Sequence, residues 1–299
     1  MIWHALLLAI STSIWGFGFI ASRLTFESYD PYWSNGLRFL IASLLGLPIL
    51  FYLKSFDRKD TPWREGIIGG FFLTGTLLFQ TIGLNYTTVA KSGFITTLYV
   101  FFVPLTMMLV YKKKYNNVFW LLVLIALVGM ALLCNLRFDD LNSGDFLVLI
   151  CSLFASFHII YVGKIAAHVK SPIEYNFIQN IFVAIFSMAI AFIVKGKVNL
   201  APLMNIHSNT FKGIFFLSVI SSMIAFSIQV IAQKKIPSHI ASLIFLLESP
   251  FAAYFGWIYF NEKLNSMNLI GAGFIMIAVI LVPILGREVT ATVKKKAQD

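Results

Sequence analysis

Glu248 is the side chain whose type and position could do the most chemistry in this sequence. It is the tenth residue of the apolar stretch 239–260, next to Ser249 and Pro250. A charged group at the centre of a bilayer costs about 2.5 kcal/mol or more, so such a residue is a functional candidate by default. Glu248 could line a substrate cavity and take up a proton in one state of a transporter. A structural carboxyl, protonated or bonded to a neighbouring helix end, is the alternative that the sequence leaves open.

Further polar and aromatic side chains fall at mid-span depth in other apolar stretches. Amides suit either helix-to-helix bonding or a zwitterionic solute, aromatic rings could line a cavity, and His158 could relay protons near neutral pH. Packing and core hydrogen bonding are the alternatives for each of them. The predicted substrate-binding residues are Trp15, Gln80, Tyr99, His158, Tyr161, Gln229 and Glu248, with Glu248 also the candidate for coupling.

Two cations and two prolines complete the candidate set. Arg38 can reach the outer interface by snorkelling, which favours a topology or packing role, and Lys91 could meet a substrate carboxylate if it turns inward. Pro250 frees the carbonyl of Leu246, and Pro104 does the same in the equivalent span. Helix breaks at matching places indicate a binding site, although a kink without a ligand is the alternative. Arg38 and Lys91 are therefore secondary site candidates, and both prolines are predicted helix breaks.

Membrane helices must position these side chains. The chain of 299 residues is 59% hydrophobic and 12% charged, with a mean hydropathy of +0.83, whereas a soluble domain carries about a quarter charged residues. The apolar stretches do not alternate apolar with polar residues as strands do, and an open sheet in lipid would leave backbone N–H and C=O groups without hydrogen-bond partners. The predicted fold class is an all-α membrane protein of ten transmembrane helices, at 2–22, 33–53, 66–84, 88–111, 117–135, 144–163, 175–195, 212–233, 239–260 and 267–285.

The sequence contains two related halves. Asp30-Pro31 is matched 141 residues later by Ser171-Pro172, and Tyr99 is matched 149 residues later by Glu248. A unit with an odd number of spans must insert its two copies in opposite orientations, as is usual in secondary transporters. Two inverted five-helix repeats are therefore predicted, with Tyr99 and Glu248 both pointing into a cavity on their pseudo-twofold axis. The expected units are residues 1–138, residues 139–286 and a basic cytoplasmic tail at 287–299.

The loop charges predict how the chain is oriented. With both termini in the cytoplasm, the inner loops and the tail hold 15 of the 23 Lys and Arg residues, the outer loops hold 7, and Arg38 lies within a span. The positive-inside rule selects this orientation. The net charge of +10 therefore marks topology and indicates no nucleic-acid partner.

Short motifs recur in a fixed order along the chain, at 14–16, 37–40, 83–88, 93–100 with 103–104, 247–250, and 261–264 before 271–273. In their order and spacing the chain resembles the EamA-type members of the drug/metabolite transporter superfamily. The resemblance implies an inner-membrane carrier, usually an exporter of amino acids or other small metabolites, with a central cavity built from spans 1, 3, 4, 6, 8 and 9. Spans 5 and 10 would lie peripherally. Ser249 departs from the usual Glu-Pro pair, so the resemblance does not carry over a substrate.

The expected function is a secondary-active transporter, an exporter of amino acids or related small metabolites that works by alternating access. Proton coupling is left open, and an uncoupled facilitator or an importer of an amine or nucleoside-like metabolite is the alternative. A channel is disfavoured by the differing polar residues of the two halves. A membrane-embedded enzyme is the distant alternative, since no motif for a metal or nucleophile is present.

The expected partners follow from this function. They are a small-molecule metabolite, the lipid bilayer and, if transport is coupled, protons, with no nucleic acid, no metal and no cofactor. The chain is expected as a monomer or weak dimer in a bacterial-type inner (plasma) membrane, with both termini cytoplasmic.

Overall fold

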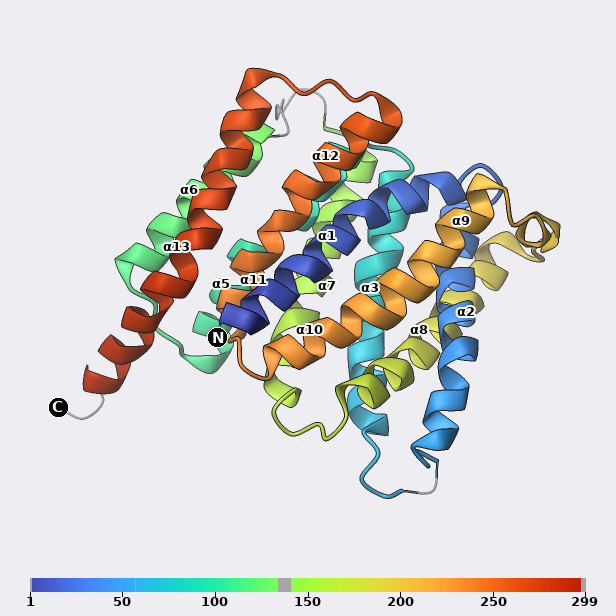
Figure 1. The fold of residues 1–299 in the computed structure, drawn as a ribbon, viewed down its shortest axis with the longest axis horizontal. Coiled ribbons are helices and arrows are strands. Elements are labelled where there is room, and N and C mark those ends of the chain that lie inside the picture. Colours follow the sequence, from blue (N-terminus) through green and yellow to red (C-terminus); the bar gives the residue numbers. More distant parts are fainter. Residues whose placement is uncertain (1, 57, 134–140, 297–299) are drawn as a thin grey trace.

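The computed structural model describes residues 2–56, 58–133 and 141–296, which form helices and turns without a strand (Figure 1). The first half of the chain forms α1 (Ile2–Thr25), α2 (Pro31–Tyr52), α3 (Trp63–Leu84), α4 (Val89–Thr96), α5 (Tyr99–Tyr111) and α6 (Asn117–Leu133). The second half forms α7 (Ser143–Ile165), α8 (Pro172–Lys195), a 3-10 turn (Ala201–Met204), α9 (Asn209–Phe215), a π-helical segment (Phe216–Ala225), α10 (Phe226–Gln233), α11 (Ser238–Ile244), a 3-10 turn (Phe245–Leu247), α12 (Glu248–Phe260) and α13 (Ser266–Lys296).

Ten apolar helical stretches follow one another in the predicted order. Eight are long and apolar enough to cross a membrane, and two shorter ones are Asn117–Leu133 and Ser266–Leu281. Three of the eight are composite: α4 with α5, α9 through α10, and α11 with α12. The predicted all-helical ten-span fold is therefore confirmed. One boundary differs, because α13 continues to Lys296, beyond residue 285 where the last span was expected to end.

The sides of the bundle carry large apolar side chains that are open to the surroundings. Leu109, Phe192 and Ile193 are 65%, 60% and 81% exposed. Apolar surface on this scale is unfavourable in water and is expected where helices contact lipid chains.

Two helices at equivalent places in the halves start from the same local chemistry. Asp30 caps α2, where its Oδ1 accepts a hydrogen bond from the backbone nitrogen of Tyr32 at 2.8 Å, and Pro31 is the first helical residue. Ser171 caps α8 through the backbone nitrogen of Glu174. A capping oxygen followed by proline fixes a helix start, because proline lacks only an amide that would have no partner there.

The two halves pack against each other along α2 with α8 and along α3 with α7. Glycines let α3 also approach α8 closely. A Cβ at Gly66 would overlap the side chain of Ile178, and one at Gly70 would lie 2.8 Å from the Cβ of Phe182. The GxxxG spacing of Gly66 and Gly70 thus joins elements of both halves.

Helices α6 and α13 lie side by side at one edge of the bundle, where α13 also contacts α11 (Figure 1). This is the peripheral place that the family resemblance implies for spans 5 and 10. Their backbones come together at Gly129 and Gly271, since a Cβ on Gly271 would overlap the carbonyl oxygen of Gly129 and the backbone nitrogen of Leu133.

The contact between α6 and α13 gives a first testable prediction. Gly271→Ala is expected to lower stability by roughly 1–3 kcal/mol, because the two backbones must move apart. Gly273→Ala is the matched control in the same helix, since a Cβ there meets nothing within 4 Å. Thermal unfolding of both variants in detergent measures the difference. Equal apparent melting temperatures would contradict the close contact.

Candidate functional site

Spans 4 and 9 are both broken, and they break at equivalent positions. In span 4, α4 ends at Thr96 and α5 begins at Tyr99. In span 9, the 3-10 turn Phe245–Leu247 separates α11 from α12, which begins at Glu248. Tyr99 and Glu248 are the pair of residues separated by 149 positions. Each second half-helix therefore starts with one of the two side chains that the repeat alignment brings into correspondence.

The prolines relate to these breaks in different ways. Pro250 is the third residue of α12, where a missing amide is tolerated, and the break before it includes Leu246, whose carbonyl it frees. Pro104 lies inside α5, and the break in span 4 comes before Tyr99, upstream of the proline. The expected helix break at Pro104 is therefore corrected: the helix runs through this residue.

Hydroxyl groups fasten the two breaks to each other. The Ser249 hydroxyl donates to the carbonyl oxygen of Gly93 at 3.0 Å and lies 3.1 Å from the hydroxyl oxygen of Thr97. Thr97 also donates to the carbonyl oxygen of Phe94 at 2.8 Å. Carbonyl groups near the end of α4 thereby find side-chain partners. Ser249 was noted in the sequence only as a departure from the Glu-Pro pair, and its position beside Glu248 was the available signal.

A cavity lies between the broken spans and their neighbours, with an empty volume of about 600 Å³ that includes its open part. Its lining comes from α1, α2, α3, α7 and the three composite spans, and the described residues of α6 and α13 contribute nothing. The predicted site residues that line it are Trp15, Gln80, Tyr99, His158, Gln229, Glu248 and the secondary candidate Arg38.

Tyr99 and Glu248 meet inside the cavity. The Tyr99 hydroxyl donates to Oε2 of Glu248 at 3.3 Å, and the two residues are 3% and 6% exposed. Among the ion pairs of the described residues, none includes Glu248. Its carboxyl group therefore has a phenol as a neighbour and no cation, which leaves it available to a proton or to a cationic group of a solute.

Aromatic rings form the wall beside this pair. Trp15 lies 5.0 Å from Phe226 and 5.3 Å from Phe245, measured between ring centroids, and the Tyr99 ring stands edge-on to Phe245 at 6.4 Å. The indole nitrogen of Trp15 is buried without a hydrogen-bond partner among the described residues. A buried indole N–H usually finds an acceptor, so this one is an exception on the wall of the cavity.

The repeat-equivalent amides Gln80 and Gln229 have different partners. Gln80 donates from Nε2 to the hydroxyl oxygen of Thr96 at 3.2 Å, which joins α3 to α4. Gln229 donates to Oε1 of Gln233 at 2.9 Å within its own helix, and its Oε1 is buried without a partner among the described residues. Gln80 thus joins two helices, while Oε1 of Gln229 is left without a partner among the described residues.

His158 lines the cavity, and one of its ring nitrogens already has a hydrogen-bond partner on α8. Its Nε2 lies 2.9 Å from Oε1 of Gln179, which also accepts a hydrogen bond from the Tyr175 hydroxyl at 2.9 Å. His158 is 3% exposed, and its ring stands edge-on to Phe226. The arrangement fits a hydrogen-bonded core histidine on the wall of the cavity.

Two candidates lie elsewhere. Lys91 forms an ion pair with Asp145, with 2.9 Å between Nζ and Oδ2, and does not line the cavity. Tyr161 is also absent from the lining, and its ring lies 6.2 Å from that of Phe72. Tyr161 follows His158 by three positions on α7, which places it nearly one turn further along the helix.

Arg38 departs from the expected snorkelling. It is 4% exposed, and its guanidinium group turns to the π-helical segment, where Nε donates to Ser222 at 2.7 Å and Nη2 to Ser221 at 2.8 Å. Sequence reasoning missed both serines and the π segment, because hydropathy does not distinguish a π turn from an α turn. A π segment inside an apolar helix is frequent at functional sites.

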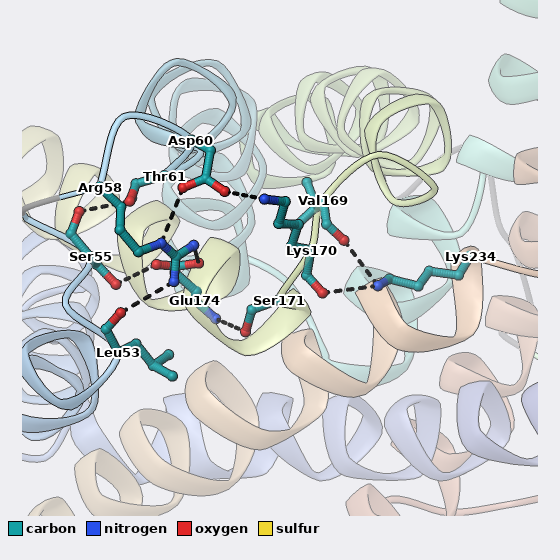
Figure 2. A network of polar contacts seen from close by, with 10 residues as sticks. All are labelled: Leu53, Ser55, Arg58, Asp60, Thr61, Val169, Lys170, Ser171, Glu174 and Lys234. Atoms are coloured by element: carbon teal, nitrogen blue, oxygen red, sulfur yellow. Dashed lines mark hydrogen bonds and ion pairs between the residues drawn. The ribbon is translucent and has the colours of Figure 1, made fainter.

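A polar network closes one end of the bundle, where the loop after α2 meets the start of α8 (Figure 2). The buried Glu174 accepts hydrogen bonds from the Ser55 hydroxyl and from Nη2 of Arg58, the latter at 3.2 Å. Nearby, the amino group of Lys234 donates to the carbonyl oxygen of Val169 at 3.0 Å. The network therefore joins a loop of the first half to the second half, and the end of α10 to the loop after α7.

Asp60 in this network gives a prediction about pH. Hydrogen bonds from Lys170 and Arg58 lower the pKa of the Asp60 carboxyl to about 2, below the value of about 3.9 for an unfolded chain. A lowered pKa stabilises the folded state above pH 4, and this contribution is lost as the pH falls toward 2.

Asp60→Asn is therefore expected to lower the apparent melting temperature slightly, by at most about 2 °C, because the group is exposed. The difference from wild type should be constant between pH 7 and 5, narrow below pH 4, and shrink in high salt. A difference that grows on acidification would contradict this role of the Asp60 carboxylate.

Comparison with known proteins finds relatives along most of the chain. A family model described as the EamA-like transporter family matches residues 2–135 and 142–283. A protein of Archaeoglobus fulgidus, named only as an uncharacterized transporter, is 32% identical over 275 residues, which cover 92% of this chain and 84% of that protein. The uncharacterized inner membrane transporter YedA of Escherichia coli K12 is 25% identical over 278 residues, 90% of this chain and 87% of YedA. A solved crystal structure has the same fold, with a TM-score of 0.74 and 16% identity over 95% of this chain and 98% of that one.

Proposed function

The chain belongs to the EamA-like transporter family, and from this premise we propose that it is a secondary-active exporter of amino acids or related small metabolites. The substrate would bind in the central cavity and reach the two sides of the membrane in turn. The observation that carries this proposal is the Tyr99–Glu248 pair, which lies in a cavity between two spans broken at equivalent positions. Broken helices that meet at mid-membrane are how many carriers build a solute site.

The proposed architecture has two inverted repeats, residues 1–138 and 139–286, followed by a basic tail at 287–299. Five spans per half and the excess of Lys and Arg in alternate loops favour opposite insertion of the halves and cytoplasmic termini. In this orientation the Glu174 network lies at the cytoplasmic end. The plasma membrane is the proposed location, as the name of the Escherichia coli relative says of that protein.

Glu248 is the proposed coupling residue. A carboxyl group whose described neighbours include the Tyr99 phenol and no cation can take up a proton in one state of the carrier and bind a cationic group in the other. Proton uptake and substrate binding would then compete for one group, which is the simplest basis for exchange. Uncoupled facilitation remains the alternative if Glu248 only binds the solute.

Counterflow in proteoliposomes tests the proposal without assuming a driving force. Vesicles that contain the purified protein are preloaded with one unlabelled L-amino acid, and entry of the same labelled amino acid is followed for each of the twenty in turn. Saturable entry above protein-free vesicles is expected for at least one of them. Amines and nucleosides are tested in the same way, and saturable entry of these solutes alone would favour the alternative substrates. Entry that does not saturate would favour a channel.

A further inference from the structure

Arg38 is a buried cation that lines the cavity without a counter-charge. Its guanidinium group donates to the hydroxyl oxygens of Ser221 and Ser222, and its Cζ lies 5.0 Å from the centre of the Phe39 ring. Within the described residues Nη1 has no hydrogen-bond acceptor, and none of the ion pairs includes Arg38. Buried charges are normally paired, because neutral partners orient a guanidinium group but do not compensate its charge.

The two serines hold Arg38 in a built site. They are successive residues of the π-helical segment and are at most 1% exposed. Two asparagines of α8 support the segment from behind, since Asn176 and Asn180 donate to the carbonyl oxygen of Ser222 at 3.0 and 3.2 Å. Arg38 is thus held by two donated hydrogen bonds to a braced segment, which leaves part of its planar donor fork for a ligand.

Glu248 is a carboxyl group without a cationic partner among the described residues, and it lines the same cavity as Arg38. It has the Tyr99 hydroxyl as a neighbour and no cation, and its carboxylate lies more than 4.0 Å from the guanidinium nitrogens of Arg38, since the two form no ion pair. One cavity therefore contains an unpaired cation and an unpaired carboxyl group that do not neutralise each other. A solute with one group of each sign would compensate both.

We propose that Arg38 binds the carboxylate of a zwitterionic amino-acid substrate, while Glu248 faces its ammonium group. This inference rests on the proposed function, because it assigns the two charged groups of the proposed solute to two residues of the same cavity. Arg38 is then a specificity-determining residue: it makes the cavity select solutes with a carboxylate over the corresponding amines. A planar guanidinium group is well suited to this, since its donors match the geometry of a carboxylate.

Two matched sets of ligands test the assignment on the purified full-length protein in detergent. One set is L-phenylalanine, phenethylamine and 3-phenylpropionate, and the other is L-leucine, isopentylamine and 4-methylpentanoate. Each amino acid is thus compared with the amine that lacks its carboxylate and with the acid that lacks its ammonium group. Titration calorimetry gives the affinities, and the shift in melting temperature gives an independent measure of binding.

In the wild type, at least one amino acid is expected to bind roughly 10–100-fold more tightly than its amine, as for loss of a charged hydrogen-bonded contact. Arg38→Gln should abolish this preference while the preference over the acid is retained. Glu248→Gln should do the reverse. Each preference is a ratio of two affinities measured on the same variant. If Arg38 had a purely structural role, Arg38→Gln would therefore lower the melting temperature and leave the preference for the amino acid over its amine unchanged. Arg38→Lys keeps the charge and should retain part of the preference.

Several outcomes would overturn the assignment. An Arg38→Gln protein that still prefers the amino acid to its amine would do so, as would a wild type that binds amines at least as well as amino acids. The latter result would leave amine transport as the function. A wild type that binds the acids as tightly as the amino acids would support Arg38 as the carboxylate site but contradict the amino-acid proposal. If no member of either set binds, the inference fails, and the counterflow experiment still decides whether the protein carries amino acids.

Discussion

Replacing Glu248 with Gln is expected to abolish the stimulation of transport by a pH gradient and to reduce amino-acid counterflow about tenfold or more. The substitution keeps the size of the side chain and an acceptor for the Tyr99 hydroxyl. It removes the charge that would bind an ammonium group and the site that would take up a proton. Both effects belong to one carboxyl group, which takes part in none of the ion pairs among the described residues.

The measurement is uptake into proteoliposomes with an imposed pH gradient, paired with counterflow at equal pH on both sides. Tyr99→Phe is the matched control, because it removes the hydrogen bond to Glu248 and keeps the carboxyl group. It should lower the rate modestly and preserve the response to the gradient. A Glu248→Gln protein with the wild-type pH response would exclude the proton role and leave uncoupled facilitation as the mechanism.

Gly16→Ala should give the second large effect, on assembly of the site. A Cβ at Gly16 would lie 2.5 Å from the Cβ of Phe251, 2.9 Å from the backbone nitrogen of Ala252 and 3.1 Å from the carbonyl oxygen of Glu248. Backbone atoms cannot turn aside as a flexible side chain can, so α1 and the first turn of α12 must separate. The expected loss of stability is about 2–3 kcal/mol, and counterflow should fall because Trp15 and Glu248 move apart.

Gly18→Ala is the matched control, because it makes the same glycine-to-alanine change in α1 without a close contact to α12. A Cβ there would meet its nearest neighbour, Cδ2 of Leu217, at 3.9 Å, which is an ordinary contact. Its apparent melting temperature in detergent should stay close to that of the wild type, while Gly16→Ala should lower it. If both variants unfold at the same temperature, the close packing of α1 on α12 does not limit stability.

The sequence predicted the helices well because hydropathy and helix starts are local properties. Asp30-Pro31 and Ser171-Pro172 mark the starts of α2 and α8 directly. The direction of a side chain depends instead on how each helix is rotated and on what it meets. Arg38 was therefore expected at an interface, although two serines 183 and 184 positions away hold it in the cavity.

The paired glutamines illustrate the same limit. Gln80 and Gln229 are equivalent in the repeat, but the residue four positions after Gln229 is Gln233, whereas the residue four positions after Gln80 is Leu84. Gln229 therefore bonds within its own helix, and Gln80 bonds to a neighbouring one. Equivalence in the alignment predicted that both glutamines lie at the same depth in the membrane. It could not predict their hydrogen-bond partners, which differ with the residue four positions later, Leu84 or Gln233.

The Tyr99–Glu248 contact also bears on how the protein arose. In a dimer of two identical five-helix subunits, the residue on the twofold axis faces its own copy, so the pair would have been two tyrosines or two glutamates. A phenol that donates to a carboxylate needs two different residues at one position. In such a pair of related units, this hydrogen bond therefore requires two copies whose sequences differ at this position, as they do here at Tyr99 and Glu248.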